Sequence, residues 1–400
     1  MGKRGKFGPG FLIAAAFIGP GTVTSATIAG ATFGFSLVWV ILLAVLSAVV
    51  LQEMVGRFSL VSGLEIAQAL VKIPRKGWVR VLLGLLAFLA IVVGCAAYEA
   101  GNIMGGSLGL NIITGIPPRT WALLISLTAF FILLKGNYPF IERFLISIVI
   151  LMGCSFLVSS LLVRPDLRLL ARGMIPRLPT GSLTLVLALL GTTIVPYNLF
   201  LHSSSILKKW RDERDLQLMR WDTGLSIGLG GIITIAIIIT AATTFYLKFH
   251  LLRQFTGTLP SITPGDLSLQ LEPLFGGFAR LCFGVGLFAA GLSSAITAPY
   301  AAAWTARGLF GWPEKSHRFR VVFSGIILSG VVISSFSLHP LSLIIVAQVT
   351  NALLLPVVAL FIGYLLNQKQ LKGYRNTLAM NLLFFLVFTV IILINIRKFV

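Results

Sequence analysis

Long apolar runs, separated by short polar connections, make up the pattern of the chain. They recur at lengths near the roughly 20 residues that a helix needs to cross a hydrocarbon core. No long hydrophilic insert separates them, so the pattern predicts a single all-α integral membrane domain. The eleven predicted spans cover residues 11–33, 36–56, 79–108, 119–136, 142–163, 181–206, 222–248, 275–305, 320–338, 341–366 and 376–396.

Two of these spans are interrupted near the middle by helix-breaking residues. The first contains FIGPGTVTSA, residues 17–26, and the sixth contains LLGTTIVPYNLFLHSS, residues 189–204. Proline removes a backbone donor and clashes with the preceding turn, so at membrane depth it frees carbonyl groups that need a partner. A simple kink at Pro20 and at Pro196 is the plainer interpretation. The matched placement favours two discontinuous helices with a substrate site between them.

The spacing of the interruptions also predicts an internal repeat. The interrupted spans are five apart, so in an alternating chain they run in opposite directions, as in an inverted repeat of five plus five helices. The predicted repeats cover about residues 9–163 and 181–366, and the eleventh span, about residues 376–397, is an added helix.

Composition and charge support a membrane protein. The 400 residues are 57% hydrophobic and 11% charged, far from the usual quarter of charged residues in soluble domains. The net charge of +20 lies in short connections rather than on an amphipathic face, so we expect no nucleic-acid partner.

Of the 32 Lys and Arg residues, 22 lie on the side of the N-terminus. The N-terminus is therefore predicted to be cytoplasmic and the C-terminus outside, in a plasma membrane. The basic connection 164–177, on the predicted outer side, fits this rule badly.

Motifs for other function classes are absent from the sequence. It contains no D-x-x-x-D, H-E-x-x-H, G-x-S-x-G or Walker pattern, so we expect neither an enzyme nor an ATP-driven subunit, and no cofactor. The three cysteines lie inside apolar runs and indicate neither a disulfide nor a metal cluster. No pore-loop filter for a passive channel is recognisable. A secondary transporter, working by alternating access on a small solute or metal ion, is the predicted class.

Ionisable residues at membrane depth are candidate functional groups. Glu99, in GCAAYEAGNIMGG, is the acidic residue placed near the middle of a span. Burying a carboxylate there costs a few kcal/mol, so Glu99 is expected to face the bundle interior, as a proton relay or cation attractor, or as an uncharged, hydrogen-bonded structural residue. His202 follows the second interruption by about one turn. It is a candidate partner of Glu99 in a proton path, although a lone histidine is often structural.

Three stretches resemble one known family of transporters. Residues 8–58, GPGFLIAAAFIGPGTVTSATIAGATFGFSLVWVILLAVLSAVVLQEMVGRF, are similar to the first two helices of the Nramp (natural resistance-associated macrophage protein) divalent-metal transporters. GTTIVPYNLFLHSS resembles the family's sixth-helix pattern, and GLSSAITAPYA resembles its G-Q-S-S-T-[IV]-T-x-x-Y-A stretch. The resemblance extends to about residue 366. It implies a LeuT-like fold of eleven helices and transport of manganese or iron, coupled to protons.

The chain departs from this family at the metal site. The resemblance places the family's Asp, Asn and Met ligands at Gly19, Thr22 and Val195, so all three metal-ligating side chains are changed. The family's histidine after the proline is Tyr197. The aspartate three residues before the third-helix glutamate is Ala96, so only Glu99 of that proton-linked pair remains.

These losses leave neutral oxygen donors at the interruptions. Transition metals are normally held by at least one carboxylate or imidazole, so dehydrating a divalent ion here would be costly, whereas a largely hydrated or monovalent ion would suit the site. The alternative is a carrier of an amino acid or other small carboxylate, which the positive ends of the two half-helices would favour. The predicted substrate-binding residues are Ile18, Gly19, Gly21, Thr22, Ile194, Val195, Tyr197 and Asn198.

Charged residues near the inner span ends complete the candidate set. The resemblance implies an inner proton exit through Lys209, Arg318 and Arg320, although snorkelling and topology explain such residues equally well. Glu53 and Glu65, also near inner ends, are predicted to form gate or interface salt bridges.

Overall fold

The computed structural model describes residues 18–136, 139–210, 212–256, 262–313, 316–336 and 339–397. Within them, ten helical segments are long and apolar enough to cross a membrane. They match ten of the eleven predicted spans. Of the first predicted span the structure describes only the part from Ile18 onward, so its first half lies outside the described residues.

The helices follow the predicted spans closely. The first half of the chain contains α2 (Pro20–Phe33), α3 (Val38–Ser62), α4 (Ile66–Lys72), α5 (Gly77–Thr114), α6 (Pro118–Lys135), α7 (Pro139–Leu162) and α8 (Leu167–Gly173). The second half contains α9 (Leu183–Thr193), α10 (Pro196–Lys209), η1 (Glu213–Asp215), α11 (Leu216–Ala241), η2 (Ala242–Tyr246), α12 (Leu247–Thr256), η3 (Asp266–Leu271), α13 (Glu272–Phe275), η4 (Gly276–Phe278), α14 (Ala279–Phe310), α15 (His317–Phe336), α16 (Pro340–Leu366), η5 (Lys369–Tyr374) and α17 (Leu378–Ile396).

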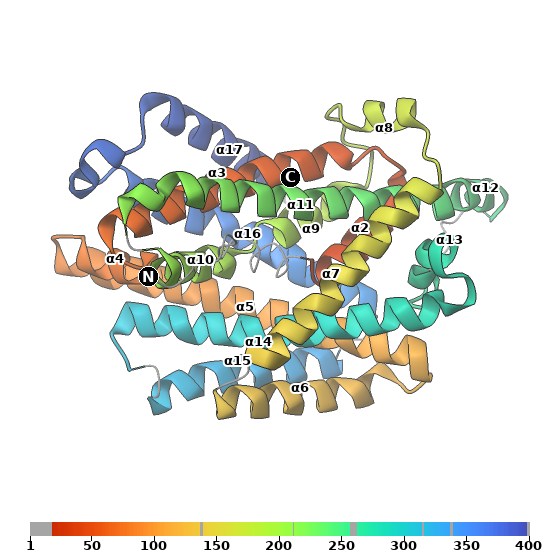
Figure 1. Ribbon diagram of the computed structural model, residues 1–400, viewed down its shortest axis with the longest axis horizontal. Helices are drawn as coiled ribbons and strands as arrows, with labels where there is room; N and C mark the ends of the chain where they lie inside the picture. The colour runs from red at the N-terminus through yellow and green to blue at the C-terminus, as the bar shows by residue number, and fades with distance from the viewer. Residues whose placement is uncertain are drawn as a thin grey trace.

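The long helices run side by side along the longest axis of the molecule, and α7 crosses them obliquely (Figure 1). The short helix α4 lies at one end of this bundle, and α8, α12 and α13 lie at the other. α5 is central, since it packs on α14, α15 and α16 as well as α6. Its length exceeds the predicted span because it continues to Thr114, where Gly115 adopts the left-handed conformation that ends many helices.

Prolines occur both at helix starts and inside continuous helices. Pro299 lies within α14 and Pro356 within α16, and neither helix is broken there. Pro20 and Pro196, by contrast, occupy the first turn of α2 and of α10, where a missing amide hydrogen costs nothing. Proline alone therefore does not produce the interruptions in this chain.

Candidate functional site

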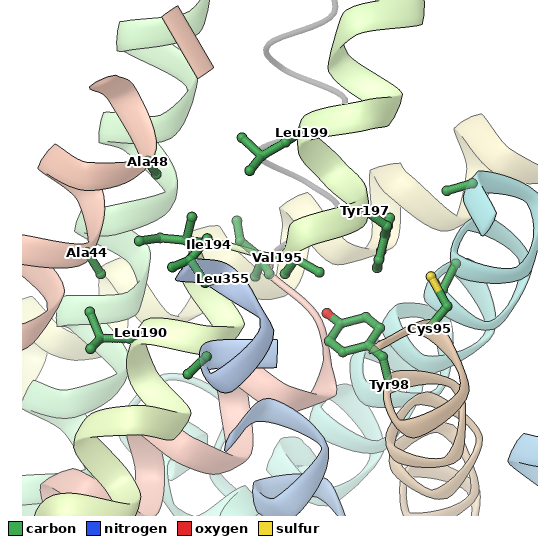
Figure 2. Packing of buried hydrophobic residues seen from close by; sticks show 14 of the residues in the cluster. Ala44, Ala48, Cys95, Tyr98, Leu190, Ile194, Val195, Tyr197, Leu199 and Leu355 are labelled. Atoms are coloured by element: carbon green, nitrogen blue, oxygen red, sulfur yellow. The ribbon is translucent and has the colours of Figure 1, made fainter. Parts of the chain in front are cut away.

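The interruption in the sixth span is a two-residue gap between helices. α9 ends at Thr193, and Ile194 and Val195 are not helical before α10 begins at Pro196. Both side chains are buried, and Figure 2 shows them in the gap between the two ribbons. The Val195 carbonyl accepts a hydrogen bond from the Asn198 amide at 3.0 Å, and the Ile194 amide donates to the Leu190 carbonyl at 2.9 Å. The Ile194 carbonyl accepts no backbone hydrogen bond from the described residues.

In the first span, the described part shows a second helix that begins at a proline. Gly19 is extended, with φ −93° and ψ −177°, and precedes Pro20 at the start of α2. Its carbonyl accepts a hydrogen bond from the Val23 amide at 3.2 Å. Both described half-helices thus begin at a buried proline and present their positive ends inside the bundle.

The two interruptions lie next to each other. The hydroxyl groups of Thr22 on α2 and Thr192 on α9 are 2.8 Å apart and hydrogen-bonded, although 170 residues separate them in sequence. α5 closes one side, since a Cβ atom at Gly105 would overlap the Pro20 ring. The structure therefore brings Gly19, Thr22 and Val195 to one buried region. Val195 belongs to it because it lies two residues after the end of α9.

Sequence reasoning did not identify Gln348, which lies against this region from α16. A Cβ atom at Gly21 would overlap the Gln348 side-chain amide, and one at Gly191 would overlap the Gln348 backbone carbonyl. The side chain is 1% exposed, and its Oε1 atom has no hydrogen-bond partner among the described residues. The available signal was the polar pair Gln348 and Asn351, one helical turn apart in an apolar span.

Tyr197 and Asn198, the first residues of α10 after its proline, are also buried there. The Tyr197 ring meets Tyr98 of α5 edge to face, with ring centroids 5.5 Å apart, and Figure 2 shows the pair beside Val195. The Asn198 Oδ1 atom, like the Gln348 Oε1 atom, lacks a hydrogen-bond partner within the described part of the chain, and the two tyrosine hydroxyls lie beside each other. Buried polar atoms without partners are rare, so a group of them indicates a place built for a ligand or water.

Glu99 and His202 are both fully buried, but they face different helices. Gly330 of α15 packs on the Glu99 side chain, because a Cβ atom there would lie 2.6 Å from the Glu99 Cγ atom. A Cβ atom at Gly56 of α3 would lie 3.4 Å from the His202 Nε2 atom. The Glu99 carboxyl group lies beside the Asn102 side chain, and the His202 ring lies beside the Gln52 backbone of α3.

Lys208 near the end of α10 and Arg318 near the start of α15 lie against aromatic rings. The Lys208 ammonium lies 4.1 Å from the ring centroid of Trp304, and the Arg318 guanidinium lies 5.7 Å from that of Trp312. Lys209 is half-buried, and Arg320 is exposed near the start of α15.

Glu53 and Glu65 form salt bridges, as predicted. Glu53 pairs with Arg57 at 3.0 Å and with Arg220 at 2.8 Å. Glu65 pairs with Arg307 at 3.8 Å and accepts a hydrogen bond from the Trp304 indole at 3.2 Å.

The donors at the interruptions are neutral oxygens. Within the described ranges, no group of three or more His, Cys, Asp or Glu side chains lies close enough to hold a metal ion. The region offers backbone carbonyls, hydroxyls and amides instead. Such donors can orient a cation or replace part of its water shell, but they supply no negative charge.

Comparison with solved structures shows that the chain has the LeuT-like fold. A crystal structure of a manganese transporter of Eremococcus coleocola superposes with a TM-score of 0.78 at 23% identity, covering 98% of this chain and 85% of that one. MhsT, crystallised with L-phenylalanine, gives a TM-score of 0.59 at 19% identity, covering 97% of this chain and 98% of that one. At these identities the likeness establishes the fold alone.

The family model described as natural resistance-associated macrophage protein-like matches residues 10–400, so the chain belongs to the Nramp family. The divalent metal cation transporter MntH of Deinococcus radiodurans is 29% identical over 86% of this chain and 77% of its own length. The MntH of Bradyrhizobium diazoefficiens is 28% identical over 82% of this chain and 72% of its own length.

Proposed function

We propose that this protein carries a divalent metal ion across the membrane by alternating access. The observation that carries the proposal is the contact between the interrupted helices, where the Thr22 and Thr192 hydroxyls are hydrogen-bonded in the buried centre of the bundle. Unwound backbone is tolerated at membrane depth only where it lines a cavity or is buried in protein. Family membership and the relatives named as divalent metal cation transporters support a metal as the substrate.

The proposed substrate site consists of oxygen donors without charge. Ile18, Gly19, Ile194 and Val195 contribute carbonyls, Thr22 and Tyr197 hydroxyls, and Asn198 an amide; Gly21 keeps the backbone accessible. To these we add the Gln348 amide, because its oxygen has no partner beside Gly21. No carboxylate offsets the free-energy cost of removing water from the ion. The metal ion is therefore expected to keep much of its hydration shell and to bind weakly.

Proton coupling is a second element of the proposal. Glu99 is a fully buried carboxylic acid beside α15, and Arg318 and Arg320 lie near the start of that helix. From Gly330 to Arg320 the helix rises about 15 Å, at 1.5 Å per residue. We propose that protons leave from Glu99 along α15 towards these arginines and Lys209. His202 faces α3 instead. A proton could pass between Glu99 and His202 only through water molecules between the helices.

The two halves, about residues 9–163 and 181–366, are proposed to form an inverted repeat, with α17 as an added helix. The N-terminus is proposed to be cytoplasmic and the C-terminus external, in a plasma membrane, on the distribution of Lys and Arg.

The alternative of an amino-acid or carboxylate substrate has no support among the MntH relatives, and MhsT is similar in fold only.

Uptake into proteoliposomes tests the proposal. The purified chain should accumulate manganese or iron(II), and Gly21→Val should abolish this, because its side chain would occupy the space of the Gln348 amide. Gly224→Ala is the matched control, since a Cβ atom at that glycine meets no other atom within 4 Å. Normal uptake by a folded Gly21→Val variant, or no accumulation of any divalent metal by the unmodified chain, would contradict the proposal.

A further inference from the structure

A cavity of 540 Å³ lies away from the helix interruptions, at the end of the bundle that carries α8. Its walls come from the C-terminal end of α2 and the turn after it, from α8 with the connections on both sides, and from η2 and the start of α12. No part of the proposed substrate site lines it. We call it the α8 cavity.

The α8 cavity is lined by three arginines and one acidic residue. The guanidinium groups of Arg164, Arg172 and Arg177 have no hydrogen-bond or ion-pair partner within the described residues. The Asp166 carboxylate caps α8 by accepting hydrogen bonds from two backbone amides, at 2.8 and 3.2 Å. Three unpaired guanidinium groups around one hollow attract an anion, and each can donate two parallel hydrogen bonds to a phosphate.

Apolar side chains form the rest of the cavity and its surroundings. Phe33, Phe35 and Ile175 line it. Leu247, also in the lining, is 70% exposed, and Leu167, which follows the lining residue Asp166 in sequence, is 71% exposed. A free inorganic anion would make no use of this surface, whereas the acyl chains of an amphiphile would cover it.

The segment that carries the arginines is fixed to the bundle. The Trp39 indole of α3 donates a hydrogen bond to the Arg177 carbonyl at 2.9 Å. Gly173 packs directly on the Phe35 backbone, so closely that a Cβ atom would overlap the Phe35 carbonyl oxygen. The positive charges therefore have a defined arrangement, which reduces the entropic cost of binding a ligand.

We infer that the α8 cavity binds the phosphate headgroup of an anionic phospholipid, with the lipid tails along the exposed leucines. This site also accounts for the basic connection 164–177, which the charge rule for membrane topology leaves unexplained. Its arginines serve a ligand rather than orientation. The inference is independent of the transported substrate, and its test measures lipid binding alone.

Native mass spectrometry of the purified full-length chain tests this inference. The unmodified protein should retain phosphatidylglycerol in preference to phosphatidylcholine with the same acyl chains. The triple variant Arg164→Gln, Arg172→Gln, Arg177→Gln should lose this preference by about fivefold for each arginine removed. Replacing the same arginines by lysine should give an intermediate result, because the charge stays and the planar fork is lost.

Arg168→Gln is the matched control. Arg168 lies on α8 and is exposed but does not line the cavity, so its variant should bind phosphatidylglycerol as the unmodified chain does. Size-exclusion profiles and melting temperatures without lipid verify that each variant is folded. The inference is overturned by equal retention of the two lipids, by a triple variant that binds normally, or by an equal loss in Arg168→Gln. Displacement of the lipid by glycerol phosphate at equal concentration would also overturn it, because the occupant would then be a soluble phosphate.

Discussion

The Thr22 hydroxyl on α2 lies 2.8 Å from the Thr192 hydroxyl on α9 and is hydrogen-bonded to it. One of these threonines stands at a position where the family resemblance places a metal-ligating asparagine. A side chain that would otherwise face a metal ion is thus engaged by a second hydroxyl across the two interrupted helices. This contact joins the interruptions through neutral groups.

Removal of this hydrogen bond should reveal coupling between the two interruptions. Thr22→Val and Thr192→Val each leave a buried hydroxyl with one partner fewer, and each should destabilise the protein by about 1–3 kcal/mol. The double variant should lose less unfolding free energy than the two single variants lose together, and the difference should be about 1 kcal/mol. Thermal unfolding of all four proteins in detergent measures the cycle. Additive effects would show that the hydroxyls do not act together.

Restoring the family's ligands should strengthen metal binding. In the triple variant Gly19→Asp, Thr22→Asn, Val195→Met, a carboxylate, an amide and a thioether replace groups that supply no charge or soft donor. We expect manganese affinity to rise by at least about tenfold, which corresponds to about 1.4 kcal/mol. Titration calorimetry measures this difference, and Thr22→Asn alone is the control because it adds no charge. Micromolar manganese binding by the unmodified chain would contradict the expected weak site.

Gly191→Ala should be strongly destabilising. α9 and α16 touch through their backbones here, and a Cβ atom at Gly191 would overlap the Gln348 carbonyl, which a change of side-chain rotamer cannot relieve. Overpacking of this kind costs roughly 1–3 kcal/mol or more. Gly224→Ala in α11, which meets open space, should be neutral or slightly stabilising. Comparing melting temperatures of the two variants tests the contact.

Glu99→Gln should separate proton coupling from metal movement. The amide keeps the shape of the buried side chain but cannot release a proton. Uptake driven by a pH gradient should fall to background, while exchange of metal driven by its own gradient should continue. Metal uptake under the two gradients measures the difference, and His202→Gln is expected to have the smaller effect because it faces α3. Unchanged pH-driven uptake in Glu99→Gln would exclude this role.

Arg57 should be the strongest structural arginine at the end opposite α8. It is 2% exposed, and it donates to Glu53, to the Tyr374 carbonyl at 2.6 Å and to the Asn376 side chain at 2.8 Å. Arg57→Ala should cost roughly 3–5 kcal/mol, since the Tyr374 carbonyl and the Asn376 side chain lose their donor and Glu53 keeps only Arg220. Arg220→Ala, whose side chain is 36% exposed, should cost under about 1 kcal/mol. Thermal unfolding distinguishes the two, and equal losses would argue against an anchoring role.

The sequence predicts the helices well because each span must bury its own backbone hydrogen bonds in lipid. The same reasoning locates the two interruptions. Pro20 and Pro196 each lie among glycine and polar residues within an otherwise apolar run. Pro299 and Pro356 show the limit of that signal, because their helices continue. Only tertiary packing decides between a kink and a gap.

Contacts across the chain were harder to anticipate. Gln348 reaches Gly21 over more than 300 residues, and the sequence of α16 does not show which distant residue it meets. Likewise, Arg164 and Arg172 were visible as a basic connection, but the cavity that they line also requires walls from α2 and η2. Burial of Glu99 could be predicted, whereas its orientation towards Gly330 depends on how α5 and α15 pack.

Gly191 and Gln348 touch through their backbones, and this contact belongs to only one of the two parts of the sixth span. α9 is held against α16, while α10 packs mainly on α3 and α14. Ile194 and Val195 join the two parts and belong to neither helix. A tilt of α10 through the backbone torsions of these two residues would therefore leave the seam between α9 and α16 closed.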